Sequence, residues 1–97
     1  MMPVIFSPEA EADLRDIGDY IAQDNPRCAA SFVQELFEHA LRIADIPYAY
    51  PKRDDLSAGL MMAVHGSYLI LFRVRGGHIQ IARILHGARD LKRIFQT

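Results

Sequence analysis

The sequence contains one cysteine, Cys28, in 97 residues, so no disulfide can form within the chain. Structural disulfides persist in oxidising compartments, whereas cytoplasmic proteins keep their thiols reduced. No basic segment followed by a long apolar stretch stands at the N-terminus, so we expect no signal peptide. These absences favour a cytoplasmic protein that depends on one packed core and not on covalent links.

Long hydrophobic runs are also missing. The longest apolar runs, residues 60–64 and 68–72, are much shorter than the roughly 20 residues of a membrane-spanning helix. The sequence has no glycine-rich phosphate-binding pattern of the G-x-x-x-x-G-K type, and its glycines read as turn residues. We therefore expect neither membrane insertion nor a cofactor.

Metal-ligand spacing is lacking as well. The chain has four histidines but no second cysteine and no tight ligand spacing beside them. Zinc sites usually show such spacing, because the metal takes up to four protein donors from a small volume. In the predicted sheet, His65 and His86 can meet at one end while His78 belongs to the opposite turn, and we expect no metal site.

The length and hydrophobic content suit a single domain over residues 1–97. The composition, 51% hydrophobic and 24% charged, is ordinary for a globular protein. The charge is divided unevenly: residues 1–50 hold nine acidic and three basic side chains, and residues 51–97 hold three acidic and eight basic ones. Such a basic half indicates an acidic partner, either nucleic acid or an acidic protein segment, or else a solvated face.

The first half of the chain predicts a helical hairpin. Ser7 and Asn25 are good N-caps, and a proline follows each of them at the first helical position. The first helix has its apolar residues at helical spacing, at Ala10, Leu14, Ile17 and Ile21. Its remaining positions hold the charged residues Asp13, Arg15, Asp16 and Asp19. The second helix is predicted to run to about residue 46, and the short break between the two makes them antiparallel.

The second half of the chain predicts strands. After a β-prone run at residues 4–6, apolar runs at residues 59–64, 68–74 and 79–85 are separated by short glycine-containing turns, typical of antiparallel hairpins. Alternation along the last run places on one face Ile79, Ile81, Arg83 and Leu85. A short terminal helix would align Leu91, Ile94 and Phe95. The predicted fold is α+β, with the order β-α-α-β-β-β: a helical hairpin packed on an antiparallel sheet, followed by a short C-terminal helix.

Four segments, which together span nearly the whole chain, resemble the ParE branch of the ParE/RelE superfamily of bacterial type II toxin–antitoxin toxins. The first two lie in the predicted helices and are Phe6-Ser7-Pro8-Glu9-Ala10 with Asp13-Leu14, and Tyr20-Ile21-Ala22 with Asn25-Pro26 and Ala29-Ala30. The last two lie in the predicted strands and are Gly66-Ser67-Tyr68-Leu69-Ile70 with Phe72-Arg73-Val74, and Ile81-Ala82-Arg83-Ile84-Leu85-His86-Gly87-Ala88-Arg89-Asp90.

The resemblance implies a small cytoplasmic toxin of a plasmid stabilisation system, which forms a hetero-oligomer with a cognate ParD-like antitoxin from the same operon. In the family, the antitoxin's C-terminal segment wraps the toxin with a helix and sometimes an extra strand. Members that resemble ParE act on DNA gyrase, and members that resemble RelE cut mRNA on the ribosome. We expect a gyrase inhibitor that is not an enzyme and that does not by itself bind specific DNA sequences. The alternatives are a ribosome-dependent endoribonuclease and a toxin-derived binding module without toxicity.

Two features depart from the family pattern. Members often carry an arginine in the strand after the glycine–leucine pair, where this chain has Met61 and Met62 after Gly59 and Leu60. Many members also carry a basic residue at the position of Ser67. Both differences remove positive charge, which slightly favours the binding module without toxicity.

The resemblance and the charge pattern together predict two binding surfaces. The surface that meets the target is predicted to hold the basic residues near the C-terminus, Arg83, Arg89, Lys92 and Arg93. The antitoxin is predicted to contact apolar residues of the helices and of the first strand of the meander, namely Leu14, Ile17, Ile21, Phe37, Met61 and Met62.

A nuclease would need a general base, a general acid and a cation to stabilise the charge that develops on the phosphate. Arg83 would then be the cation and His86 the acid or base. RelE-like enzymes also use further lysines and usually a C-terminal tyrosine or histidine, whereas this chain has two lysines and no tyrosine after Tyr68. The structural alternative is an ion pair of Arg83 or Arg89 with Asp90 that fixes the terminal segment.

Overall fold

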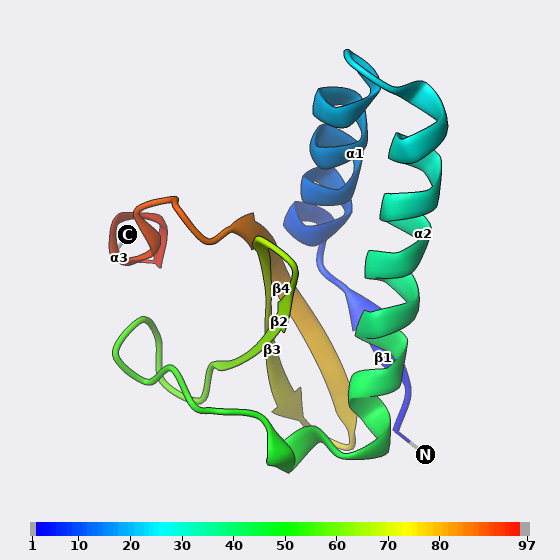
Figure 1. Ribbon diagram of the computed structural model, residues 1–97. Helices are drawn as coiled ribbons and strands as arrows, with labels where there is room; N and C mark the ends of the chain where they lie inside the picture. Colours follow the sequence, from blue (N-terminus) through cyan, green and yellow to red (C-terminus); the bar gives the residue numbers. More distant parts are fainter. Residues whose placement is uncertain (1, 96–97) are drawn as a thin grey trace.

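The secondary-structure elements follow one another in the predicted order (Figure 1). The computed structural model describes residues 2–95. Its helices are α1 (Pro8–Ala22), α2 (Pro26–Arg42) and α3 (Leu91–Phe95), and its strands are β1 (Val4–Phe6), β2 (Met61–His65), β3 (Tyr68–Arg75) and β4 (His78–His86). The predicted helical hairpin, strand meander and short C-terminal helix are confirmed.

The strands form one sheet in the order β1-β4-β3-β2. The prediction of antiparallel pairing holds for the meander of β2, β3 and β4. β1 adds a parallel edge beside β4, with Val4 opposite Ile79 and Phe6 opposite Ile81. Both helices and most of the meander separate β1 from β4 along the chain, and a connection of that length allows parallel pairing. β1 and β2 are therefore the edge strands of a mixed sheet.

The two long helices begin at the predicted caps. The Ser7 Oγ accepts a hydrogen bond from the Ala10 N–H at 3.0 Å, and the Asn25 Oδ1 accepts one from the Cys28 N–H at 3.1 Å. α2 ends at Arg42, before the predicted residue 46, and continues as a 3₁₀ turn over Ile43–Asp45. Pro47 disfavours helical backbone at Ile46, so the helical stretch stops after Asp45.

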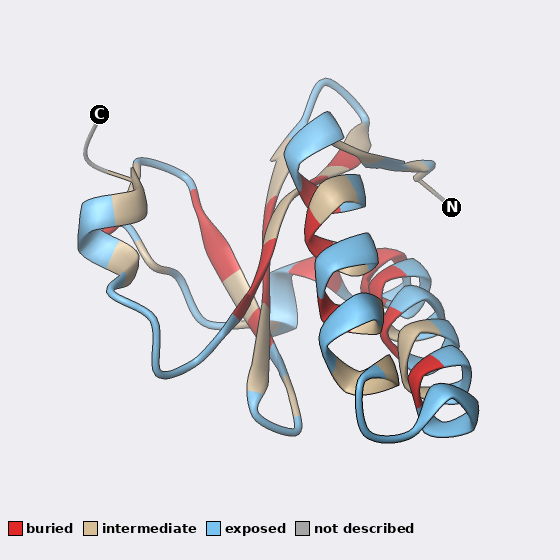
Figure 2. Ribbon diagram, turned by 90° about the horizontal axis from the view of Figure 1, so that it is seen from above, coloured by how far each residue is buried: buried red, intermediate tan, exposed pale blue. Residues whose placement is uncertain are grey.

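The sheet has a hydrophobic cluster on each face. The larger one lies between the sheet and the helical hairpin, and its most buried members include Leu36, Ile43, Ile70, Phe72, Ile79, Ile81 and Ile84. The smaller one lies on the opposite face and contains Leu56, Leu60, Leu71 and Leu85, against which pack Leu91, Ile94 and Phe95 of α3. Figure 2 shows buried residues along the strands and on the helix faces turned toward them, with α3 on the other side of the sheet.

A β-bulge interrupts the regular alternation of β4. Leu71 pairs with Arg83 and Phe72 pairs with Ile81, so Ala82 has no partner of its own on β3. Such an extra residue reverses which side chains face the helices from that point onward. The predicted alternation is therefore wrong after Ile81: Ile84 enters the cluster beneath the helices, whereas Leu85 enters the cluster on the opposite face.

Candidate functional site

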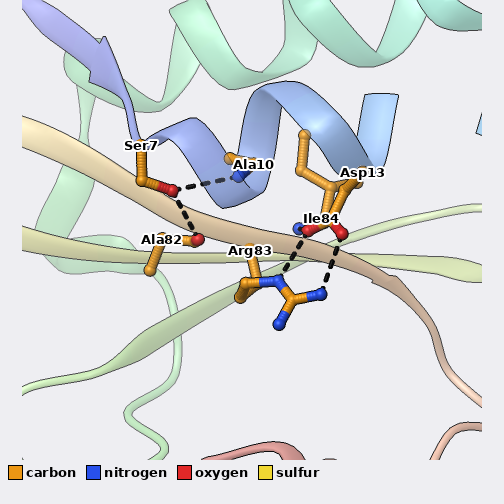
Figure 3. A network of polar contacts seen from close by, with 6 residues as sticks. All are labelled: Ser7, Ala10, Asp13, Ala82, Arg83 and Ile84. Carbon is orange, nitrogen blue, oxygen red and sulfur yellow. Dashed lines mark hydrogen bonds and ion pairs between the residues drawn. The ribbon is translucent and has the colours of Figure 1, made fainter. Parts of the chain in front are cut away.

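Side chains of α1 and its cap close the edge of β4 where β1 ends (Figure 3). The Ser7 N–H donates to the Ile81 carbonyl at 2.9 Å, and the Ser7 hydroxyl donates to the Ala82 carbonyl at 2.7 Å. One turn into α1, the Asp13 Oδ2 accepts a hydrogen bond from the Ile84 N–H at 2.8 Å. Ser7 and Asp13 thus supply the hydrogen bonds that a longer β1 would have made.

Asp13 also forms a bidentate ion pair with Arg83. The Arg83 Nε donates to Oδ2 at 2.8 Å, and its Nη2 donates to Oδ1 at 2.9 Å. The hydrogen bond with Asp13 is the main reason that the pKa of Arg83 is raised. The prediction that Asp13 lies on the charged side of its helix is wrong, because this residue is only 7% exposed.

The structural alternative considered for Arg83, an ion pair with Asp90, is not formed, since Arg83 pairs with Asp13. Over residues 2–95, neither Arg83 nor Arg89 forms an ion pair with Asp90. The Asp90 Oδ1 accepts a hydrogen bond from the Arg93 N–H at 3.3 Å at the start of α3. Asp90 therefore caps the terminal helix.

A groove of about 830 Å³ lies between α1, the first turns of α2, the β2–β3 turn and the end of β4. Its floor is mainly apolar and includes Ile17, Ile21, Phe32, Tyr68 and Ile84. Acidic side chains, Asp13 and Asp16, line it on the helix side, and His86 and Arg89 line it on the β4 side. The groove can accept an apolar segment that carries a charge on each flank.

The residues predicted to bind the antitoxin do not form one surface. Ile17 and Ile21 line the groove, whereas Leu14 lines a smaller hollow on the helical hairpin. Phe37, 38% exposed, stacks on Phe6 with ring centroids 5.3 Å apart. Most of the Ile17 side chain is covered, and its exposed fraction is 8%.

The two methionines of β2 face opposite sides of the sheet, because side chains alternate along a strand. Met61 is 5% exposed in the cluster beneath the helices, so almost none of it is available to a partner. Met62 packs against the cluster on the opposite face, and its sulfur accepts a contact from the Arg53 Nη1 at 3.3 Å. The prediction that Met61 contacts the antitoxin is therefore replaced by a role in the core.

The basic residues predicted to meet the target separate into two groups. Arg89, Lys92 and Arg93 are exposed around α3, whereas Arg83 is half-buried in its ion pair. His86 is exposed, and its Nδ1 accepts a hydrogen bond from the Ala88 N–H at 3.0 Å. The C-terminal segment alone therefore presents freely accessible positive charge at the predicted target surface.

The histidines pair differently from the prediction. The Nδ1 atoms of His65 and His39 are 2.9 Å apart, while the ring of His86 packs against Tyr68 with centroids 5.2 Å apart. Over the described part of the chain, no three side chains are arranged to hold a metal ion. Sequence reasoning missed both Asp13 and the His39–His65 pair. Only Asp13 had a detectable signal, because a carboxylate three residues after Ala10 and four before Ile17 lies within the apolar helix face.

Comparisons with known proteins find toxins named ParE and RelE. Residues 4–91 match the family model described as the ParE toxin of the type II toxin–antitoxin system parDE. Two relatives from Caulobacter vibrioides are each 34% identical: Toxin ParE1, aligned over 95% of this chain and 96% of that protein, and Toxin RelE2, over 92% and 99%. None of the helices in residues 2–95 is long and apolar enough to cross a membrane.

Solved structures show the same fold. A chain of the chromosomal ParDE system from P. aeruginosa superposes with a TM-score of 0.77 at 28% identity, covering 89% of this chain and 96% of that one. A chain of the toxin–antitoxin complex RelBE2 from Mycobacterium tuberculosis superposes with a TM-score of 0.59 at 24% identity, covering 88% and 96%. The second likeness concerns the fold alone.

Proposed function

The chain belongs to the ParE toxin family of type II toxin–antitoxin systems, and from this membership we propose that it inhibits DNA gyrase and that a ParD-like antitoxin neutralises it by direct binding. Family membership alone does not specify the target or the class of antitoxin, because two relatives of equal identity carry the names ParE1 and RelE2.

The ion pair of Arg83 favours a toxin that acts by binding and not by cleaving RNA. A nuclease needs a cation whose donors are free to meet the charge on the phosphate. Two guanidinium donors of Arg83 are instead directed at Asp13, whose carboxylate balances the charge. The Nδ1 of His86 is occupied by the Ala88 N–H, which leaves only its other ring nitrogen for acid–base work.

The exposed basic residues around α3 are the proposed gyrase-facing surface. Arg89, Lys92 and Arg93 are exposed, and α3 packs on the sheet through its apolar side. This arrangement holds cations on an anchored segment, which favours contact with an acidic surface of a partner. Arg83 is left out of the proposed surface because its charge is already paired.

The groove beside α1 is the proposed antitoxin site. An amphipathic helix inserts its apolar face into a hydrophobic groove in a common mode of peptide recognition. Strand addition to β4 beyond the end of β1 is less favoured, since side chains of Ser7 and Asp13 already bond to its backbone there. The start of the β2 edge is also occupied, because Lys52 forms a bridge with Met61. We therefore propose a helix as the part of the antitoxin that enters the groove.

A gyrase assay with the purified chain tests the proposed target. Supercoiling and trapped double-strand breaks are scored, and ribosome-dependent mRNA cleavage is measured in parallel. We expect gyrase inhibition that is relieved by the antitoxin from the same operon, and no mRNA cleavage. Cleavage without gyrase inhibition would instead support the RelE-type nuclease, which the likeness to Toxin RelE2 keeps as the second candidate.

A charge variant tests the proposed surface. Gyrase inhibition is expected to be lost when glutamine replaces Arg89, Lys92 and Arg93 together. Because these side chains are exposed, the free energy of unfolding should change by less than about 1 kcal/mol. The matched control replaces three exposed arginines of the helical hairpin, Arg15, Arg27 and Arg42. Equal loss of inhibition in both variants would show that only total charge matters, and the surface assignment would fail.

A further inference from the structure

A histidine pair joins α2 to the end of β2. The Nδ1 atoms of His39 and His65 are 2.9 Å apart, and both side chains are half-buried. A hydrogen bond between two ring nitrogens needs one nitrogen that carries a proton and one that offers a lone pair. The contact therefore exists when both rings are neutral or when one is charged. It is lost when both are charged, because two N–H groups then face each other.

The groups around the pair make the doubly charged state unfavourable. The Oε2 of Glu35 lies 3.9 Å from the Nε2 of His65 and can balance one positive charge. No carboxylate of residues 2–95 forms such an ion pair with His39. Burial lowers the pKa of His39, and the nearby His65 and Arg42 lower it further. Beyond these groups, Tyr68 on β3 packs against His86 on β4, with ring centroids 5.2 Å apart.

The histidine pair is also connected to the groove. Phe32 packs edge-on against His65 with centroids 5.6 Å apart, and it contacts Tyr68 at 5.4 Å. Phe32 and Tyr68 both line the groove, as do Gly66 and Ser67 directly after His65. The contact between the two histidines thus helps to set how far the β2–β3 turn lies from α2, and with it the width of the groove.

We propose that the His39–His65 contact is an acid-sensitive device that regulates the groove: protonation of both rings separates the β2–β3 turn from α2 and weakens antitoxin binding. The link to the antitoxin rests on the function proposed above. A histidine whose pKa is lower in the folded chain than in the unfolded one contributes stability at pH values above its unfolded pKa, which is about 6.5. That stability is lost as the pH falls below this value, because the unfolded chain then binds more protons.

Unfolding by urea at pH 7.5 and pH 5.5 tests the contact itself. Acidification should raise the unfolding equilibrium constant of both chains. The factor by which it rises should be roughly threefold or more larger in the unmutated chain than in His39→Gln. Glutamine can keep a hydrogen bond to His65 but does not titrate in this range. His78→Gln, in the opposite turn, is the matched control and should behave as the unmutated chain. The same pH dependence in the unmutated chain and His39→Gln would overturn the proposal.

A titration of the histidine ring signals by NMR supplies a readout that does not depend on the stability of a variant. In the unmutated chain, the pKa of His39 should lie below the ordinary value for histidine, and in His65→Gln its titration midpoint should move upward because one neighbouring charge is gone. An unchanged midpoint for His39 in His65→Gln would show that the two rings are not coupled.

Antitoxin affinity at the two pH values tests the link to the groove. Acidification should raise the Kd for the antitoxin from the same operon, and the factor should be roughly threefold or more larger for the unmutated chain than for His39→Gln. Titration of the antitoxin itself affects both chains equally and therefore cancels in this comparison. An equal rise in both chains would overturn the link. Absence of binding at pH 7.5 would instead refute the proposed antitoxin, while the unfolding and NMR results would still decide the contact.

Discussion

At the scale of single residues, Asp13 shows how one side chain can serve several parts of the fold. It accepts hydrogen bonds from the backbone of Ile84 and from two guanidinium nitrogens of Arg83. A nearly buried carboxylate is stable only when such partners compensate for the loss of water. Asp13 therefore connects α1 to β4 and holds Arg83 in place.

Asp13→Ala is expected to lower the free energy of unfolding by about 2–4 kcal/mol, because hydrogen bonds to a charged group are lost and the Ile84 N–H is left without its acceptor. Asp19→Ala, at an exposed position of the same helix, is the control and should change it by less than about 1 kcal/mol. Urea denaturation measures both. A loss in Asp13→Ala no larger than in the control would contradict the structural role.

Comparison with Arg83→Ala and with the double variant isolates the ion pair. Because the two side chains interact directly, their effects should fall short of additivity by roughly 0.5–3 kcal/mol. Additive effects would mean that the pair contributes nothing beyond the hydrogen bond to Ile84.

At the scale of elements, local signals define the helices. Each long helix starts at a capping side chain followed by a proline, and the caps form hydrogen bonds to the first turn. The two caps differ, since the Ser7 hydroxyl also donates to the Ala82 carbonyl of β4. The Asn25 side chain, in contrast, forms one hydrogen bond within residues 2–95, and this bond is with the Cys28 N–H at the start of α2.

Asn25→Ala is expected to lower the free energy of unfolding by about 1 kcal/mol, since the N–H of Cys28 loses its side-chain acceptor. Asn25→Asp should retain most of this stability, because a carboxylate accepts the same hydrogen bond and favours the positive end of the helix. Thermal unfolding followed by circular dichroism distinguishes the two. A loss in Asn25→Asp as large as in Asn25→Ala would mean that the amide does more than cap the helix.

At the scale of the whole molecule, the groove exists only because four parts of the fold meet. Residues of α1, the first turns of α2, the β2–β3 turn and the end of β4 all line it. The fold places the exposed Asp16 of the first half and the exposed Arg89 of the second half along the same groove, so the uneven charge of the sequence is reflected in its two sides. An exposed aromatic ring at its margin, Tyr20, is 69% exposed and available to a partner.

Tyr20→Ala is expected to weaken antitoxin binding by roughly tenfold or more, because exposed tyrosines in a binding groove are frequent hot spots of protein interfaces. Tyr48, which is 73% exposed and does not line the groove, offers a matched control in Tyr48→Ala. Isothermal titration calorimetry with the antitoxin from the same operon measures both. Equal affinities of the two variants would place the antitoxin elsewhere on the toxin.

The sequence by itself determined the element order, the helix caps and the strand meander, because capping residues, prolines, glycines and hydrophobic spacing act within a few residues of chain. It also determined the family, whose model matches residues 4–91. The direction of β1 and the end of α2 had weaker local signals, and there the prediction was incomplete.

Only the tertiary structure decided which polar residues act together. Asp13 and Arg83 are 70 residues apart in sequence, and His39 and His65 are 26 apart. The local sequence around each of these four residues does not indicate which residue is its partner. The bulge at Ala82 likewise depends on how β3 and β4 align. Because of it, Ile84 and Leu85 each lie on the face of the sheet opposite to the one that strict alternation predicts. Periodicity describes one element at a time, whereas a charge pair, a bulge or a groove arises from packing between elements, so these features required the folded chain.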